Sequence, residues 1–366
     1  MASELFKLIN NIYMSFDNIR EFTYDKLYKN RQIIHVVGNG WGSYYFSKNI
    51  DKTKYKILTI ASNKNVLDTP KLVKLISDQT TKYEFNNPYT HYYSGKVINF
   101  DQEKKELYTD HAKFKYENVV FAIGSEPNNF NIEGVDKYAN YFKQINDVHK
   151  LKQKLNNINK ICIIGTGPTG IELSSILKKQ YNKDVYLIEG MNTILPGFND
   201  ITKKSIHQYL KDSDIYLNTN NLVKKVTKTG IHTAINPAGN NVFNYDLIIW
   251  TGGVRFNGYK STALFDRLNK IKMITPRGIE TNNDFSIGNE KNIYCIGDMV
   301  SNKGPPTAQN AKQHGIWLAN YFNNNKQITQ EYEYKEQGKL IHLNNKTYLE
   351  SKYYNDYIPI IINIFI

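Results

Sequence analysis

Short apolar runs alternate with stretches of helical periodicity through most of the chain. Ile33–Val37 and Ile161–Ile164 are each followed by a glycine-rich turn and then by a helical stretch. Apolar runs bounded by turn residues are typical of buried strands. Strands that alternate with helices indicate an α/β fold with parallel sheets. The repeated succession therefore predicts two Rossmann-like units in one chain.

The two glycine-rich turns carry the first chemical signal. They consist of Gly38, Asn39, Gly40, Trp41, Gly42 and Ser43, and of Gly165, Thr166, Gly167, Pro168, Thr169 and Gly170. In such a turn the first glycine permits the bend, the second admits a pyrophosphate, and the third allows close helix packing. The following helix N-terminus offers unpaired N–H groups to phosphates. One turn alone would be weak support, but two in the same context predict two dinucleotide sites, with looser packing at Ser43.

An acidic residue distinguishes the second unit from the first. Glu189 ends the apolar run that begins at Val185, in the position where a carboxylate binds ribose hydroxyls. No arginine follows it, so a 2′-phosphate would be repelled and NADH should be preferred to NADPH. The corresponding run of the first unit reaches Ser62 and Asn63 without a carboxylate. Ser62 or a backbone group is therefore expected to hold that adenosine.

Three further apolar runs end at small or polar residues and are expected to return beside the nucleotides. Their ends supply Ala122 and Gly124, then Thr251, Gly252 and Gly253, and finally Gly297 and Asp298. A carboxylate such as that of Asp298 accepts a hydrogen bond from a flavin ribityl hydroxyl. The alternative is that Asp298 is an ordinary helix N-cap.

Composition narrows the function classes. The chain has 366 residues, a length that favours two or three domains. Its net charge is +13, from 47 Lys and Arg against 34 Asp and Glu. A positive field favours nucleotide phosphates or acidic lipid surfaces, although an AT-rich genome would also give a lysine-rich chain. Without clustered arginines and interleaved aromatic residues, a nucleic acid is not expected as a partner.

The cysteines and the chain ends exclude other classes. Cys162 and Cys295 form no CxxC pair and lie in apolar runs, so neither a redox dithiol nor a metal site is expected. No apolar run is long enough for a transmembrane helix, and residues 1–30 fit neither a signal peptide nor a mitochondrial presequence. Residues 1–30 carry a short amphipathic pattern. The apolar residues 357–366 are interpreted as a strand packed on the body or as an interfacial anchor, which leaves a cytoplasmic or peripheral membrane location open.

Four stretches together resemble one known family. They are the first turn, the segment from Leu67 to Pro70, the second turn extended to Glu172, and the segment from Gly304 to Gln313. In these stretches the chain resembles the type II NADH dehydrogenases, which are single-subunit NADH:quinone oxidoreductases of the two-dinucleotide-binding-domain flavoprotein superfamily. The Pro-Pro-Thr-Ala-Gln run in the last stretch is the most specific of these signals.

The resemblance implies a domain order and a reaction. The expected parts are an N-terminal extension (1–30), an FAD-binding domain in two stretches (31–145 and 255–330), an inserted NAD(H)-binding domain (146–254) and a C-terminal region with membrane contact (331–366). The expected reaction passes a hydride from NADH to FAD and then two electrons to a quinone, without proton pumping. A homodimer is one assembly consistent with this class.

The resemblance also assigns roles to residues. Thr69 and Ala308 are expected to contact FAD, and Glu172 is expected near the nicotinamide and the flavin. A helix starting near Thr307 would place Gln309 and Gln313 on one face that lines a quinone pocket. The alternatives are a solvated Glu172 and an exposed polar stripe, and Lys312 and His314 are expected to face solvent. Two other functions stay open: an FAD-dependent NADH oxidoreductase with a soluble acceptor, and a non-catalytic NADH-binding or redox-sensing protein.

Overall fold

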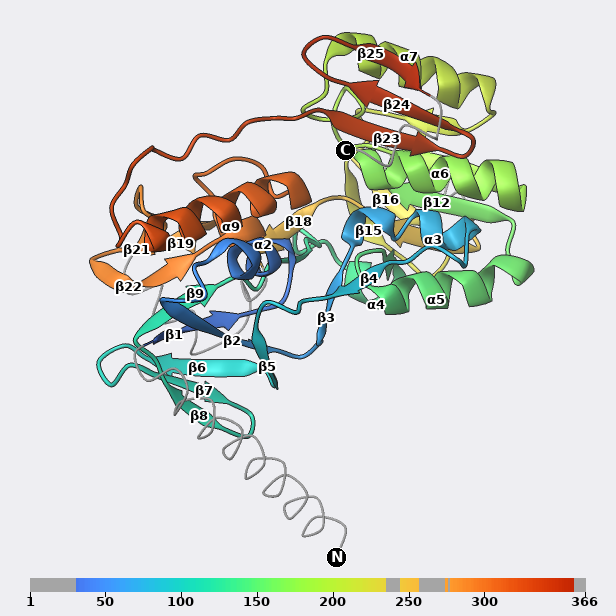
Figure 1. Ribbon diagram of the computed structural model, residues 1–366. Helices are drawn as coiled ribbons and strands as arrows, with labels where there is room; N and C mark the ends of the chain where they lie inside the picture. Colours follow the sequence, from blue (N-terminus) through green and yellow to red (C-terminus); the bar gives the residue numbers. More distant parts are fainter. Residues whose placement is uncertain (1–30, 235–243, 257–273, 276, 359–366) are drawn as a thin grey trace, which may run out of the picture.

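The computed structural model describes residues 31–234, 244–256, 274–275 and 277–358. The amphipathic segment expected within residues 1–30 and the last apolar residues, 359–366, lie outside the described residues. Two parallel-stranded units and a small C-terminal sheet make up the described part (Figure 1).

The first unit is built on a six-stranded sheet in the order β21-β22-β9-β1-β2-β5. Its strands are β1 (Gln32–Val37), β2 (Tyr55–Ala61), β5 (His91–Ser94), β9 (Asn118–Phe121), β21 (Ser286–Ile287) and β22 (Glu290–Cys295). β1 pairs in parallel with β2 and β9, and β22 joins β9 in parallel. Helices α2 (Trp41–Asn49) and α9 (Ala308–Asn323) belong to this unit. The sheet therefore combines two stretches of chain that the second unit separates in sequence.

The second unit has a five-stranded, wholly parallel sheet in the order β11-β17-β12-β13-β14. The strands are β11 (Asn140–Tyr141), β12 (Lys160–Ile164), β13 (Asp184–Ile188), β14 (Tyr216–Asn218) and β17 (Leu247–Trp250), and the helices are α5 (Ile145–Lys154), α6 (Pro168–Tyr181) and α7 (Asp200–Asp212). In both units the predicted succession of strand, turn and helix is confirmed. So is the α/β fold class with two Rossmann-like units.

Shorter strands and helices lie beside the two sheets. Beside the first unit lie β3 (Asn65–Leu67), β4 (Glu84–Asn86), β6 (Val97–Asp101), β7 (Glu106–Thr109) and β8 (Lys113–Lys115), with η1 (Thr69–Lys71) and η3 (Gly297–Met299). Helix α3 (Lys74–Ser77) packs against α5 and α6 of the second unit. The remaining short elements are β10 (Ser125–Pro127), β15 (Val223–Val226), β16 (Ile231–Thr233), β18 (Val254–Phe256), β19 (Ile274–Thr275), β20 (Gly278–Ile279), α4 (Val135–Tyr138) and η2 (Leu155–Asn157).

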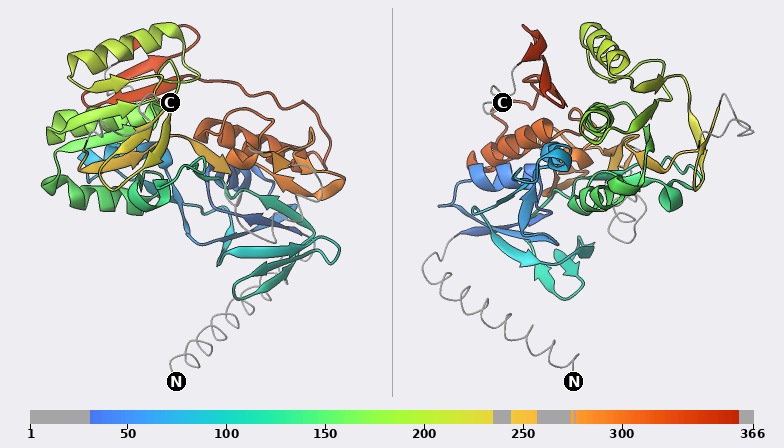
Figure 2. Two further views of the ribbon diagram at one scale, coloured as in Figure 1. Left: turned by 180° about the vertical axis from the view of Figure 1, so that it is seen from behind. Right: turned by 90° about the vertical axis from the view of Figure 1, so that its right-hand side faces the viewer.

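The C-terminal residues form an antiparallel sheet of β23 (Lys339–Leu343), β24 (Lys346–Glu350) and β25 (Asn355–Ile358). Ile341, Leu343 and Tyr348 belong to the same buried cluster as the second unit's core. A long segment without regular structure leaves α9 and crosses the outside of the molecule to reach β23 (Figure 2). The chain thus returns from the first unit to cover the second.

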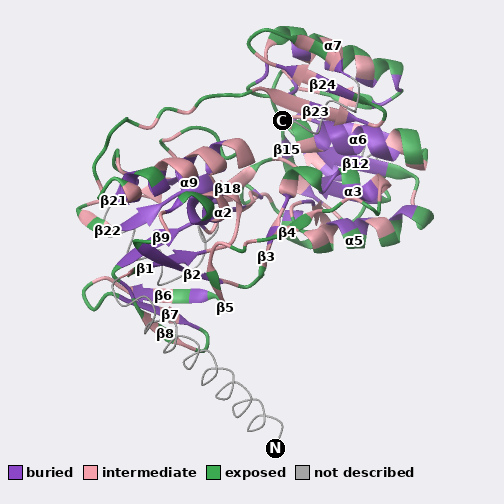
Figure 3. Cartoon of the chain, viewed as in Figure 1, coloured by how far each residue is buried: buried purple, intermediate pink, exposed green. Residues whose placement is uncertain are grey.

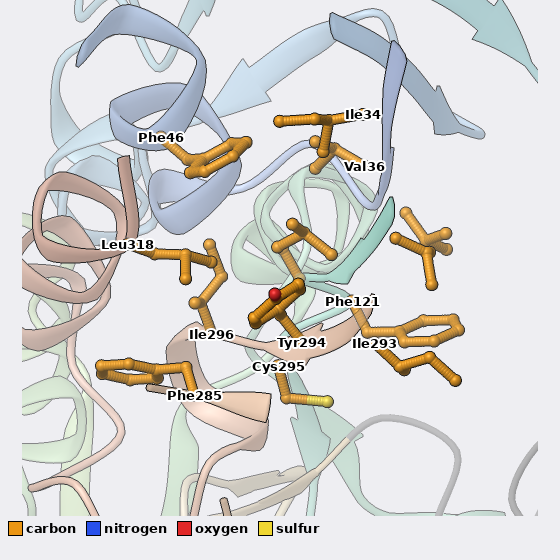
Figure 4. Close-up of a cluster of buried hydrophobic side chains, with 14 of the residues drawn as sticks. Ile34, Val36, Phe46, Phe121, Phe285, Ile293, Tyr294, Cys295, Ile296 and Leu318 are labelled. Carbon is orange, nitrogen blue, oxygen red and sulfur yellow. The ribbon is translucent and has the colours of Figure 1, made fainter. Parts of the chain in front are cut away.

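Buried side chains concentrate in the two sheets and in the helices that cover them (Figure 3). Phe121, Tyr294 and Cys295 sit at the centre of the first unit's cluster (Figure 4). Cys162, on β12 of the second unit, belongs to a separate buried cluster that includes Tyr245 and Trp250. Both cysteines are fully buried in strands, as the sequence predicted, and burial raises the pKa of each thiol. Neither is poised to act as a thiolate.

Two glycines set the contact between α2 and α9. A Cβ on Gly315 would lie 2.4 Å from the Gly42 carbonyl oxygen and 2.7 Å from the Phe46 nitrogen. Because these neighbours are backbone atoms of a helix, they cannot move aside independently. The two helices can approach this closely only while position 315 has no side chain.

We expect Gly315→Ala to lower the free energy of unfolding by about 1–3 kcal/mol, because the added methyl overpacks the crossing. Chemical denaturation of the variant and the parent measures the difference. Asn320→Ala, at an exposed position of the same helix, is the control and should have little effect. An unchanged stability for Gly315→Ala would contradict the crossing described here.

Candidate functional site

A cleft of about 380 Å³ opens at the carboxyl ends of β1, β2 and β9. Parallel sheets bind ligands at this edge. The residues predicted for the flavin site line it: Gly38, Asn39, Gly40, Trp41, Gly42, Ser62, Thr69, Ala122, Gly124, Gly297, Asp298 and Ala308. Ser43, the remaining member of the predicted set, is fully buried on α2. The fold therefore brings segments from the whole length of the first unit to one cavity.

The first glycine-rich turn is shaped by close backbone contact. Gly38 has a φ of +104°, and a Cβ there would lie 2.4 Å from the Ala122 carbonyl oxygen. A Cβ on Gly40 would meet nothing within 4 Å. The first glycine is thus required by the protein itself, whereas the second faces open space where a ligand can approach the backbone.

Two polar groups of this turn lack partners within the protein. The Ser43 hydroxyl and the Trp41 indole Nε1 are buried without a hydrogen bond. A buried polar group left unsatisfied costs about 1–3 kcal/mol. Trp41 lines the cleft, so its indole N–H can donate to a phosphate oxygen there, and the turn fits the pyrophosphate of FAD.

A hydrogen-bonded trio lies in the same cleft. The Ser125 hydroxyl donates to Asp298 Oδ2 at 2.7 Å and accepts from Lys143 Nζ at 3.2 Å. Lys143 Nζ is also 3.9 Å from Asp298 Oδ2. Asp298 lies inside η3 and makes no capping bond, so the N-cap alternative does not describe it. Lys143 was not predicted: it lies in the loop before α5, and only the fold brings it to the cleft.

The charges in the cleft favour an anion. Among the described residues, its charged lining consists of Lys96, Lys143 and Asp298. The cleft therefore carries one more positive charge than negative. Basic side chains near phosphate oxygens form charge-assisted hydrogen bonds, which are stronger than neutral ones.

His314 corrects the sequence prediction that it faces solvent. It is fully buried; its Nδ1 accepts from the Gly297 N–H at 3.0 Å and its Nε2 lies 2.9 Å from the Lys303 carbonyl oxygen. Burial lowers its pKa to about 4, so the ring is neutral and Nε2 carries the proton. The prediction failed because His314 lies on the face of α9 that packs at Gly315. The imidazole holds the turn that carries Asp298.

The second glycine-rich turn repeats the geometry of the first. Gly165 has a φ of +102°, and a Cβ there would lie 2.6 Å from the Thr251 carbonyl oxygen. A Cβ on Gly170 would lie 2.1 Å from the Gly165 oxygen, while one on Gly167 would meet nothing within 4 Å. The Thr251 hydroxyl donates to the backbone of β12 and of the turn, at 3.0 Å each. Each of the three glycines therefore has the surroundings that the motif predicts for its position.

The remaining residues predicted for this site border the same turn. Pro168 and Thr169 begin α6, and Gly252 and Gly253 follow the end of β17. Glu189 lies against the turn: its Oε2 accepts from the Thr166 N–H at 3.0 Å and from the Thr166 hydroxyl at 2.7 Å. The carboxylate thus lies beside the dinucleotide turn at the end of β13, as the ribose assignment requires.

Glu172 lies apart from the flavin cleft. It belongs to α6, is 6% exposed and accepts a hydrogen bond from the His342 N–H of β23 at 2.9 Å. Burial raises its pKa to about 8. The side chain is therefore buried rather than solvated, and it holds its proton at neutral pH.

Gln309 and Gln313 share one face of α9, and the predicted start of this helix is confirmed by the Thr307 cap. Their amides bind the segment between α9 and β23. Gln309 Oε1 accepts from the Tyr334 hydroxyl at 2.8 Å, and the Gln313 amide exchanges two bonds with the Lys335 backbone, at 2.7 and 3.0 Å. Neither side chain lines the flavin cleft, and neither is freely exposed.

Two further features bear on the class of site. Within the described ranges, no group of His, Cys, Asp or Glu is arranged to hold a metal ion. In that same part of the chain, no helix combines the length and the apolar character needed to cross a bilayer.

Comparison with known proteins identifies the family. The model of the pyridine nucleotide-disulphide oxidoreductase family matches residues 33–315. The chain belongs to this family. That match spans both glycine-rich turns and the segment that contains Gln309, so it includes the whole predicted NAD unit and most of the predicted FAD unit.

Named relatives agree with the resemblance found in the sequence. A probable NADH dehydrogenase of Dictyostelium discoideum is 27% identical, covering 84% of this chain and 76% of the relative. The mitochondrial external NADH-ubiquinone oxidoreductase 2 of Saccharomyces cerevisiae is 26% identical, covering 82% of this chain and 64% of that protein. NDH2 of Plasmodium falciparum, solved in complex with NADH, matches with a TM-score of 0.78 and 21% identity over 90% of this chain and 92% of that chain. The predicted fold and the resemblance to NADH dehydrogenases are confirmed.

We expect Lys143→Met to weaken FAD binding by roughly tenfold or more, because hydrogen bonds to charged groups contribute about 1.5–3 kcal/mol. The FAD dissociation constant, measured by ultrafiltration of the purified protein, tests this. Lys143→Arg should keep most of the affinity, and Lys150→Met, on an exposed part of α5, should keep all of it. Equal affinities for both methionine variants would show that Lys143 does not contact the cofactor.

Glu172 should also make stability depend on pH. Its folded pKa of about 8 lies above the ordinary value of 4.5, so the folded protein holds a proton that the unfolded chain has lost. Its contribution is complete below about pH 4.5 and is lost as pH rises toward about 8. Over that range the parent should lose up to ~1.4 kcal/mol per pH unit relative to Glu172→Gln. Denaturant unfolding of both proteins across this range is the measurement, and parallel pH profiles would refute the burial argument.

Proposed function

We propose that this protein is a type II NADH dehydrogenase, an FAD-dependent NADH:quinone oxidoreductase. The observation that carries the proposal is the pair of dinucleotide turns on two parallel sheets, one beside a cleft whose lining residue Trp41 has a buried indole N–H without a protein partner. The names of the relatives, NADH dehydrogenase and NADH-ubiquinone oxidoreductase, support the same activity. The chain spans only 64% of the yeast relative, so the acceptor and the assembly are parts of this proposal.

In this proposal the first unit holds FAD. The turn at residues 38–43 binds the pyrophosphate, and Ser62 lies at the end of β2 that is assigned to the adenosine. Asp298, held by Ser125, accepts from the ribityl chain, and Lys143 adds positive charge. Bound FAD would accept a hydride from NADH and pass electrons on in pairs. The protein's own contribution is to position this group and to stabilise its negative charge.

The second unit holds NADH. The turn at residues 165–170 binds the pyrophosphate at the N-terminus of α6. Glu189 accepts from the ribose hydroxyls and repels a 2′-phosphate. Thr251, Gly252 and Gly253 are assigned to the inner side of the same site, where β17 ends beside the turn.

Glu172, Gln309 and Gln313 are assigned to the acceptor side of the reaction. Glu172 holds a proton at neutral pH, and we assign it to proton exchange during quinone reduction. One N–H of the Gln313 amide donates to the Lys335 carbonyl oxygen, and the second N–H is assigned to a quinone carbonyl.

The same proposal includes the division of the chain into an FAD-binding domain in two stretches, 31–145 and 255–330, around an NAD(H)-binding domain at 146–254. It also includes peripheral contact with a membrane that supplies the quinone. Thiol chemistry of the disulphide-reductase type is not supported, because Cys162 and Cys295 are both fully buried.

We expect NADH to bleach the flavin absorbance faster than NADPH, and a short-chain quinone to restore it. Stopped-flow absorbance measures both half-reactions. Glu189→Gln keeps the size and the acceptor atom of the side chain but removes its charge, so it should narrow the preference for NADH. A protein that binds FAD but is reduced by neither nucleotide would overturn the proposed function. An unchanged preference in Glu189→Gln would overturn the ribose assignment alone.

A further inference from the structure

Aromatic and lysine side chains gather on one face of the first unit, beside the cleft. We call this set the aromatic–lysine face. It consists of Trp41, Tyr44, Tyr45 and Lys48 on α2, Lys52 just after it, Phe85 on β4, Tyr89, and Lys312 on α9. All five rings are partly exposed to solvent. None of them belongs to the buried core clusters.

The rings hold one another in place. The Tyr44 ring lies 4.8 Å from Phe85 and 5.1 Å from Tyr45 between centroids, nearly perpendicular to both. Trp41 stacks on Tyr45 at 5.9 Å. Edge-to-face packing of this kind covers ring faces with neighbouring edges. The face is therefore preformed, and it offers few open ring faces on which nucleic-acid bases could stack.

The lysines complete the face. Lys312 Nζ lies 5.2 Å from the Tyr45 centroid, and Lys48 Nζ lies 5.9 Å from both tyrosine centroids of α2. Lys52 Nζ lies 6.0 Å from Tyr89 and donates to the Ser47 carbonyl oxygen, so this lysine supports the ring cluster. In the part of the chain that the structure describes, none of these three lysines has a carboxylate within ion-pair distance. The nearby exposed carboxylate of Glu84 accepts a hydrogen bond from Asn65 instead.

This face adjoins both parts of the proposed redox site. Trp41 belongs to the aromatic–lysine face and also lines the flavin cleft. Lys312 lies on α9 between Gln309 and Gln313, the two residues assigned to the quinone. If this surface bound a membrane, a lipid-soluble acceptor carried by that membrane would arrive close to the amides of Gln309 and Gln313 and to the cleft.

We propose that the aromatic–lysine face docks onto an anionic lipid bilayer. Tryptophan and tyrosine concentrate at the level of lipid headgroups, because their rings combine an apolar body with a polar edge. Lysine stems can lie along apolar surface while their ammonium groups reach acidic headgroups. The inference rests on the proposed function in one respect: the acceptor is taken to come from the membrane.

The test is flotation of the purified holoprotein with vesicles of phosphatidylcholine, with and without about 30% phosphatidylglycerol. We expect binding only to the anionic vesicles, with weakening as salt rises. K48E/K312E should lower the partition coefficient by roughly tenfold or more, since each basic residue near an anionic surface contributes about fivefold. K204E/K211E makes the same charge change on exposed positions of α7 and should bind like the parent.

A second variant separates the rings from the charge. Tyr45→Ser leaves the charge unchanged and should also weaken flotation, by loss of the ring on which Lys48 and Lys312 lie. Equal loss in the two charge-reversed variants, or equal binding to neutral vesicles, would overturn the proposal. The absence of vesicle binding by the parent would also overturn the proposal. This outcome includes the case in which the face pairs only with a second copy or with another protein.

Flavin reduction by NADH in solution, measured on the same samples, keeps the two proposals apart. K48E/K312E should be reduced at the parent's rate, because neither lysine lines the cleft. Normal reduction without vesicle binding would remove the docking face and leave the proposed function standing. Vesicle binding by a protein that NADH cannot reduce would overturn the proposed function and leave the docking face standing.

Discussion

One backbone contact, made twice, determines how both units present their ligand sites. In each unit the first glycine of the turn presses against the carbonyl group at the end of the neighbouring strand, that of Ala122 for Gly38 and that of Thr251 for Gly165. No side chain fits between this glycine and the carbonyl group, so the sharp bend after β1 and after β12 requires glycine at that position. The bend turns the next helix N-terminus toward the edge of the sheet, and the second glycine of each turn then faces open space. The direction of α2 and of α6, and hence the position of the two sites, follows from this contact.

The C-terminal part of the chain connects the two units through the residues assigned to the acceptor. The segment after α9 binds the amides of Gln309 and Gln313, and the strand that it leads into donates its His342 N–H to Glu172. One continuous stretch therefore contacts the helix of the first unit and the buried carboxyl of the second.

The sequence could predict those features whose geometry depends on residues close together along the chain. The glycine turns, the strands before them and Glu189 were all found, because their spacing along the chain fixes their geometry. Lys143 was missed because its loop has no pattern, and only the packing of α5 against the second unit's core carries that loop to the cleft. His314 was misplaced because polarity alone suggested solvent, whereas the adjacent Gly315 signals a close helix crossing at that position. The bonds of Gln309 and Gln313 to residues more than twenty positions away could not have been read from their helical spacing.

The two turns differ in how completely the protein satisfies them, and this difference matches the roles of the two dinucleotides. In the second turn the Thr166 N–H and hydroxyl both donate to Glu189, so the protein itself satisfies these two polar groups. In the first turn the indole N–H of Trp41, a residue that lines the cleft, is a buried donor with no protein partner. A ligand that satisfies this donor removes a desolvation penalty, which adds to its affinity. A turn whose polar groups the protein satisfies suits a substrate that enters and leaves at each turnover, and a turn that leaves a buried donor for the ligand suits a cofactor that stays.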